Sequence, residues 1–150
     1  MNKGSPYLLL LIMAILHFLL MYVLMYIMVD RFSNVFPNLN QFYMAAIMTA
    51  PMIILEVFLM NRMYPNKKMN IILIAIVLVV LIILFISIRQ QIAVSDEQFL
   101  KSMIPHHAGA ILMCEKASIN DAEIRELCRR IISSQQSEID QMKSKLDEIG

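Results

Sequence analysis

Three long runs of apolar residues constrain the fold of this chain more than any other feature. The runs are Tyr7–Val29, Phe42–Met60 and Met69–Ile88, which are 23, 19 and 20 residues long. At about 1.5 Å per residue, a helix of each length crosses a hydrocarbon core of about 30 Å. With 59% hydrophobic residues, the composition is also too apolar for an ordinary soluble domain. The sequence therefore predicts an all-α protein with three transmembrane helices.

The charged residues divide the chain into two predicted domains. Residues 1–88 carry five Lys or Arg and two acidic residues, whereas residues 89–150 carry eight Lys or Arg and ten acidic residues. We therefore expect a transmembrane domain at residues 1–90 and a polar domain at residues 91–150.

Positive charges beside the apolar runs predict the topology. The connection after the second run contains Arg62, Lys67 and Lys68, whereas the connection before that run contains only Arg31. The positive-inside rule then places the second connection in the cytoplasm. The N-terminus would lie inside as well, and the polar domain would lie outside. We expect the protein in a bacterial cytoplasmic membrane, with the lipid bilayer as a partner.

The polar domain has the pattern of two amphipathic helices. The first is expected to begin at a capping box, Ser95 followed by Gln98, and the second near Asp121. Apolar residues recur at three- and four-residue steps between Ile124 and Ile149. A hairpin of two such helices has little core of its own. We therefore predict an extracytoplasmic two-helix hairpin that forms a four-helix bundle with another copy, which makes the protein a homo-oligomer.

Charge and motifs exclude two broad classes of function. The net charge is only +1 and no basic stripe is present, so we expect no nucleic-acid partner. No motif surrounds a Ser-His-acid order, and no Glu precedes His106 or His107 by three residues, as a di-iron helix would require. The sequence thus predicts a protein that is not an enzyme.

Sulfur and imidazole side chains gather on the predicted hairpin. If the chain reverses near Asp121, Cys114 lies level with Cys128, and the His pair lies level with two glutamines. Met103 precedes His106 and His107 by three and four residues, so these side chains share one helix face. Thioether and neutral imidazole suit copper(I) or silver(I). The alternative is that the histidines form hydrogen bonds across the bundle with Gln135 and Gln136.

Two segments of the hairpin resemble a known family. Residues 99–110 (FLKSMIPHHAGA) and 131–142 (IISSQQSEIDQM) are similar to the signature segments of the domain of unknown function 305 family, over about residues 95–148. The resemblance implies a ferritin-like helical bundle, exported or membrane-tethered, with some members linked to copper and silver. The metal-ligand candidates that it implies are Met103, His106, His107, Met113 and Met142, with Gln135, Gln136 and Glu138 as neighbours. Ala108 departs from the polar residue frequent in the family.

The two cysteines lie outside the pattern of the resembling family, and three interpretations stay open. Cys114 and Cys128 could form a disulfide in an extracytoplasmic domain, provided that their Cα atoms come within about 7 Å. They could add thiolates to a soft-metal site as accessory ligands. They could also be small buried apolar side chains.

Methionine is unusually abundant in the first two predicted spans. The chain has 14 Met, and eight of them lie in these two runs. In the first run they share an arc of about 120° with a histidine. Such a face would form an intramembrane path for metal, although Met also fills gaps in apolar cores. The path residues are Met13, His17, Met21, Met44, Met48 and Met52.

The function expected from these features is a membrane-anchored protein that binds copper(I), and also silver, for copper handling or resistance. One alternative is an oligomeric copper(I) transporter or channel lined by the Met residues of the first two spans. The other is a structural oligomeric membrane protein without metal.

Overall fold

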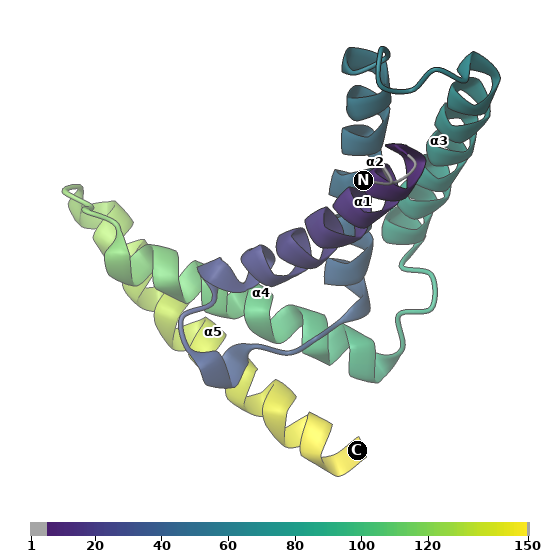
Figure 1. Cartoon of the computed structure of the whole chain (residues 1–150). Helices are drawn as coiled ribbons and strands as arrows, with labels where there is room; N and C mark the ends of the chain where they lie inside the picture. The colour runs from purple at the N-terminus through teal and green to yellow at the C-terminus, as the bar shows by residue number, and fades with distance from the viewer. Residues whose placement is uncertain (1–5, 150) are drawn as a thin grey trace. The chain divides into compact units, whose positions relative to one another are not determined.

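The structure, a computed structural model, describes residues 6–149. Over these residues the chain is entirely helical, with five α-helices and no β-strand (Figure 1). The prediction of an all-α protein is confirmed. The helices are α1 (Pro6–Leu24), α2 (Leu39–Leu59), α3 (Lys67–Gln90), α4 (Asp96–Lys116) and α5 (Ala122–Ile149), with the short 3-10 helices η1 (Met25–Met28) and η2 (Phe32–Asn34) between α1 and α2.

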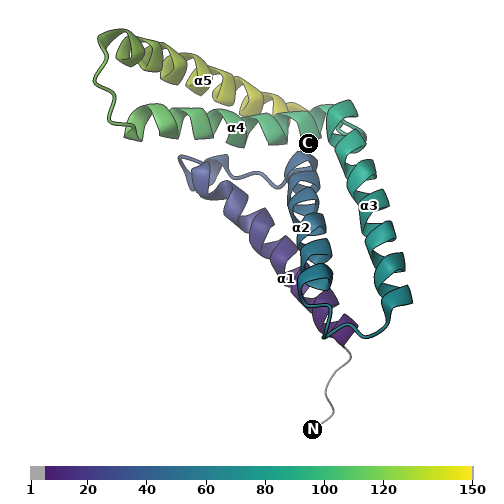
Figure 2. The ribbon, with the colours of Figure 1, turned by 90° about the horizontal axis from the view of Figure 1, so that it is seen from above.

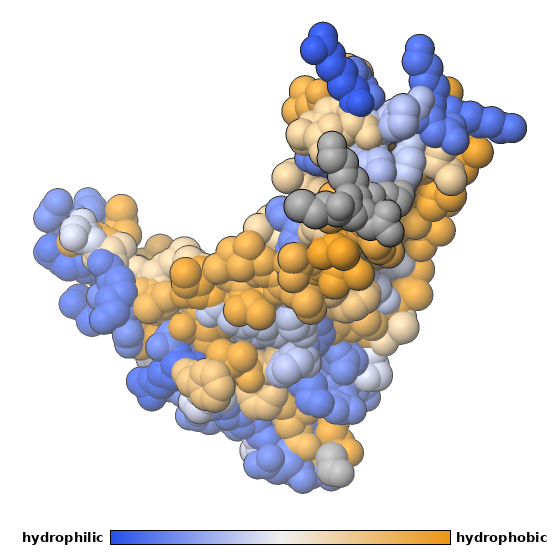
Figure 3. Space-filling view, in the orientation of Figure 1, coloured by the Kyte–Doolittle hydropathy of each residue, from blue (hydrophilic) through white to orange (hydrophobic). Residues whose placement is uncertain are grey.

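Three helical segments are long and apolar enough to cross a membrane, as the sequence predicts. They are Pro6–Met28, Leu39–Leu59 and Lys67–Gln90, of 23, 21 and 24 residues. Most of their large apolar side chains are exposed, and hydrophobic residues cover the visible surface of α1 and α3 (Figure 3). An exposed apolar surface of this extent is stable only against lipid or another protein. The segments are therefore consistent with association with a membrane.

The chain forms two compact units. The first unit combines the chain up to Met25 with Gln41–Ile92. The second unit combines Tyr26–Asn40 with the chain from Ala93 onward. The connection between α1 and α2 thus belongs with α4 and α5, a grouping that the sequence analysis does not anticipate.

Polar contacts hold one end of the first unit together. The hydroxyl of Tyr7 on α1 donates to Oδ1 of Asn70 on α3 over 2.8 Å, and Nδ2 of Asn70 donates to the carbonyl of Tyr64 over 2.9 Å. Tyr64 is only 3% exposed and packs with Leu10 and Val57. The Tyr64 hydroxyl also lies 3.4 Å from Oε1 of Glu56, the acidic residue of α2. These contacts give the apolar helices a shared anchor that does not depend on apolar packing alone.

In the second unit, α4 and α5 run side by side in opposite directions (Figures 1 and 2). Their common core consists of Ile104, Ala108 and Ile111 from α4 and Ile139 from α5, all almost completely buried. A 28-residue helix such as α5 therefore contributes a single fully buried side chain, Ile139, to this core. The remaining apolar side chains of α5 stay at least partly exposed.

The connection from Tyr26 to Asn40 covers the other side of α4. Val29 and Phe36 pack against the core of α4 and α5. Gly109 lies at this contact, where a Cβ would be 3.4 Å from the carbonyl oxygen of Met28, an ordinary van der Waals distance. The amide of Leu39 also donates to the side chain of Gln98 on α4 over 2.8 Å. The second unit thus has a third layer that enlarges its small core.

Helix starts in the second unit follow the capping residues of the sequence. The Ser95 hydroxyl accepts from the amide of Gln98 at the start of α4. Oδ1 of Asp121 accepts from the amides of Glu123 and Ile124 over 2.8 and 2.9 Å at the start of α5. Each side chain satisfies backbone donors that have no partner within the helix. The predicted helix starts at these positions are confirmed.

Candidate functional site

His107 is a buried polar side chain of the second unit, and both of its ring nitrogens have a partner. It lies on the face of α4 that packs against α5 and is 8% exposed. Its Nδ1 lies 2.9 Å from the carbonyl oxygen of Met103, one turn earlier on α4. Its Nε2 lies 2.6 Å from Oε2 of Glu138 on α5. Both ring nitrogens therefore face oxygen acceptors.

This arrangement ties the His107 ring to both helices, because one nitrogen contacts α4 and the other contacts α5. The Ser134 hydroxyl, which donates to Oε1 of Glu138 over 2.8 Å, and then the His107 ring hold the pKa of the Glu138 carboxyl below its usual range. A metal ion at Nε2 of His107 would first have to displace Glu138.

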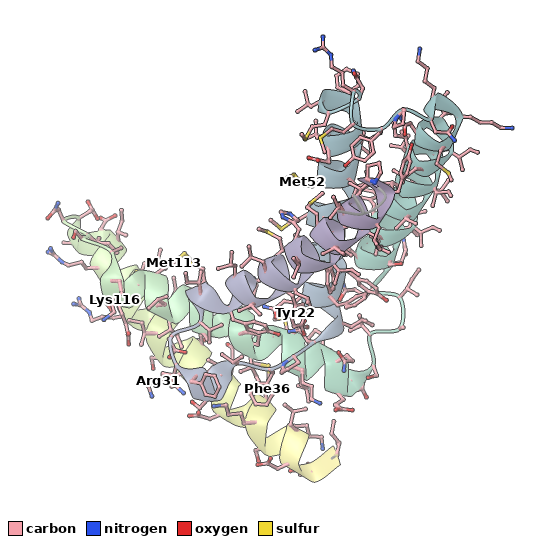
Figure 4. All side chains as sticks on the ribbon, viewed as in Figure 1. Tyr22, Arg31, Phe36, Met52, Met113 and Lys116 are labelled. Atoms are coloured by element: carbon pink, nitrogen blue, oxygen red, sulfur yellow. A yellow bond between two sulfur atoms is a disulfide. The ribbon has the colours of Figure 1, made fainter. Side chains whose placement is uncertain are left out.

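A second group of predicted ligands lies on an exposed stripe of α4. At about 100° per residue, Met103, His106 and Met113 fall within an arc of about 80°. The His106 side chain is exposed and Met103 is half-buried. Met113, labelled in Figure 4, is 53% exposed. Met103 lies one turn from His106, whereas Met113 lies seven residues beyond it, at about 10 Å along the axis. Met103 and His106 are therefore close enough to bind one ion, and Met113 is not.

The remaining hairpin candidates lie on α5. Met142 packs against the buried core of Ile104 and its neighbours. Oε1 of Gln135 is buried and accepts no hydrogen bond from any residue between 6 and 149. Nε2 of Gln136 donates to Asp140 over 2.9 Å. The predicted ligand set is thus divided between an exposed stripe on α4, the His107–Glu138 contact and the apolar core.

No cluster of three His, Cys, Asp or Glu side chains that could hold a metal occurs within the described part of the chain. Methionine is not among these four residue types, although its thioether also binds soft metal ions. Met103 and His106 form a smaller set that includes a thioether. Any metal bound there must be one that accepts sulfur and imidazole.

Cys114 and Cys128 form a disulfide that links the end of α4 to the start of α5, with their Cα atoms 5.2 Å apart. Of the three interpretations of the cysteines, the structure therefore contains the disulfide. In this form neither sulfur is a thiolate, so neither is a metal ligand. The bond closes the connection between the two helices.

The intramembrane candidates are also divided. Met13, His17 and Met52 line one cavity between α1 and α2. Met44 and Met48 on α2 are exposed and do not line it. Met21 on α1 does not line it either. Three of the six predicted path residues are thus brought together.

Ser134 contributes a contact at this site that the sequence does not predict. Its hydroxyl holds Glu138 in place for His107, from one turn earlier on α5. The spacing of Ser134 and Glu138, four residues apart, is a signal that could have identified the pair. Serine is common on helix surfaces, however, and the pattern becomes specific only when a histidine lies opposite.

Replacing Glu138 with Gln should change the environment of Nε2 of His107, because it removes the carboxylate that lies 2.6 Å from this nitrogen. The 15N chemical shift of Nε2 in the full-length protein should therefore change more than that of Nδ1, whose contact with the Met103 carbonyl stays in place. The variant Glu148→Gln, which alters an exposed acid paired with Lys145, is the control and should leave both shifts unchanged. An unchanged Nε2 shift in Glu138→Gln would contradict the contact.

The comparisons with known proteins agree with the resemblance seen in the sequence. Residues 87–146 match the family described as Domain of unknown function (DUF305). An uncharacterized protein of Acanthamoeba polyphaga mimivirus is 40% identical over 114 residues, which are 74% of this chain and 72% of the relative. No solved structure matches the chain. The chain therefore belongs to the domain of unknown function 305 family.

Proposed function

We propose that the protein is a membrane-anchored binding protein for soft monovalent metal ions, copper(I) and silver(I), with Met103 and His106 as ligands. The observation that carries the proposal is the difference in hydrogen bonding between His106 and His107. His107 is occupied on both ring nitrogens, whereas His106 is exposed and has no hydrogen-bond partner among the described residues. One turn away, Met103 offers a thioether on the same stripe of α4.

The donor chemistry supports a soft ion. Thioether sulfur and neutral imidazole bind copper(I) and silver(I) well, whereas calcium and magnesium require oxygen ligands. Neither Met103 nor His106 brings a negative charge. The proposed role is accordingly binding, in copper handling or resistance, rather than catalysis.

One chain supplies only two of these ligands, so the proposal includes a second copy. The second unit exposes large apolar side chains on both α4 and α5, which is unusual for a surface in contact with water. A homo-oligomer formed through α4 and α5 would cover them and bring together two thioethers and two imidazoles. The exposed side chains are Phe99, Met113, Ile124 and Leu127.

We also propose that the second unit lies on the extracytoplasmic side of the membrane, with the N-terminus inside. Two independent features support this topology. The connection between α2 and α3 carries the positive charges that favour the cytoplasm. The Cys114–Cys128 disulfide is typical of an oxidising compartment and rare in the cytosol.

Silver(I) titration of the full-length protein in detergent tests the Met103–His106 site. Silver needs no reductant, so the disulfide stays closed and offers no thiolate. We expect one ion per two chains at this site, and a loss of affinity of at least about tenfold in His106→Gln and in Met103→Leu. Isothermal titration against a competing thioether ligand measures both quantities.

Met113→Leu provides the matched control, because Met113 lies on the same stripe but too far along α4 to share the ion. It should leave affinity unchanged. If His106→Gln and Met113→Leu bind silver equally well, the proposed site is wrong.

A further inference from the structure

A shallow cavity, open at the surface of the first unit, is lined by sulfur and imidazole side chains from two apolar helices. It has a volume of about 410 Å³ and lies between α1 and α2, where Figure 4 labels Met52. Met13 and His17 are four residues apart on α1, so their side chains share a face, and Met52 comes from α2. The other lining residues are Leu9, Ile12, Leu16 and Leu20.

His17 is a polar residue within an apolar helix. It lies in the apolar segment Pro6–Met28, where a polar side chain normally faces a polar partner or water. No residue between 6 and 149 forms a hydrogen bond with its ring. The groups nearest to it in the cavity are hydrocarbon side chains and two thioethers. A ligand that accepts the imidazole lone pair would remove this mismatch.

We propose that this cavity binds a soft monovalent metal ion, copper(I) or silver(I), through a ring nitrogen of His17 and the sulfur atoms of Met13 and Met52. Three neutral soft donors from two helices match the preference of these ions. No carboxylate lines the cavity, so a divalent ion would bring two uncompensated charges into an apolar environment. The site has no residue in common with the Met103–His106 site and does not depend on it.

The surroundings of the cavity favour an ion that needs no water. Leu9, Leu16 and Leu20, which line it, are 55%, 61% and 53% exposed, and in a bilayer they would meet acyl chains. Magnesium and calcium keep water or oxygen ligands and would lose them there. Copper(I) and silver(I) are stable with a few soft ligands and no water.

The spacing of the other methionines separates this proposal from ordinary apolar packing. Met21 and Met48 lie on the same two helices but do not line the cavity. If Met serves only as a flexible gap-filler, all these positions should be equivalent toward metal. If the proposal holds, only the cavity residues should matter.

The test uses the full-length protein in nanodiscs, carrying Met103→Leu and His106→Gln so that the other proposed site is absent. Silver(I) is the probe, and the disulfide remains closed. We expect one ion per chain, with affinity falling at least about tenfold in Met13→Leu, Met52→Leu and His17→Gln. Met21→Leu and Met48→Leu are the controls and should bind as the background does. Met to Leu replacements conserve volume, so the helices should stay intact.

X-ray absorption of the bound silver gives a second readout that does not depend on any variant. It should show sulfur together with nitrogen in the first coordination shell. No ion in the background protein, equal losses in the control and cavity variants, or a shell without nitrogen would each overturn the proposal. Failure of the Met103–His106 site would instead appear as unchanged silver binding when that pair is replaced.

Discussion

Opening the Cys114–Cys128 disulfide is expected to lower the free energy of unfolding of the α4–α5 pair by about 3 kcal/mol. The bond joins residues 14 positions apart and restricts the unfolded chain at the point where the two helices reverse. The helices share a small core, so the loss is a large part of what keeps them paired. Hydrogen exchange of the α4 and α5 amides, measured in the full-length protein with and without a dithiol reductant, gives the size of the effect.

Two controls make this prediction specific. The double variant Cys114→Ser and Cys128→Ser should match the reduced protein and should not respond to the reductant. Protein recovered from cells after rapid thiol blocking should carry the disulfide, because the second unit is proposed to lie outside the cytoplasm. Unchanged exchange on reduction would contradict the energetic argument, and free thiols in cells would contradict the topology.

Local signals in the sequence are sufficient to predict the helices. The three apolar runs coincide with helices, because length and hydrophobicity are properties of each segment alone. Ser95 and Asp121 are the capping side chains of α4 and α5, as their positions before acidic and apolar residues predict. No distant contact is needed to interpret either kind of pattern.

Contacts across helices are less predictable, and His107 shows why. Counting back from the turn places His107 level with Gln135 and Gln136, yet the structure pairs it with Glu138. Side chains on a helix lean toward its N-terminus, and the His107 ring reaches back one turn to Met103. On α5, the residue that lies at the level of Met103 is Glu138. Counting Cα positions omits this lean, and the partner therefore changes from an amide to a carboxylate.

The role of residues 26–40 could not be predicted for a different reason. This connection has neither a long apolar run nor a regular period, and its contribution rests on a few side chains such as Val29 and Phe36. Asn34, on its own 3-10 helix, donates to Asp30 over 2.6 Å and stiffens the same segment. Such contacts depend on where α4 lies in space, which the sequence of the connection does not specify.

Replacing Ile139 with Ala should destabilise the second unit by about 2–5 kcal/mol. Ile139 is 0% exposed and is the one fully buried side chain that α5 offers to Ile104 and Ile111 on α4. Its truncation would remove apolar contacts and leave a cavity that the rigid helices cannot fill. Thermal unfolding and hydrogen exchange of α5 in the full-length protein measure the loss.

Ile124→Ala is the matched control, because Ile124 lies on the same helix but is 50% exposed, and its replacement should change stability by about 0.5 kcal/mol or less.

The Ile139→Ala variant also tests the contacts of the candidate site. Glu138 precedes Ile139 directly, so loosening α5 at this point should weaken the contact between Glu138 and His107 and change the 15N shift of His107 Nε2. Met103 and His106 both lie on α4, so Ile139→Ala should leave their silver affinity unchanged as long as the two copies stay associated. Equal effects of Ile139→Ala and Ile124→Ala would mean that the disulfide, rather than the apolar core, holds α5 against α4.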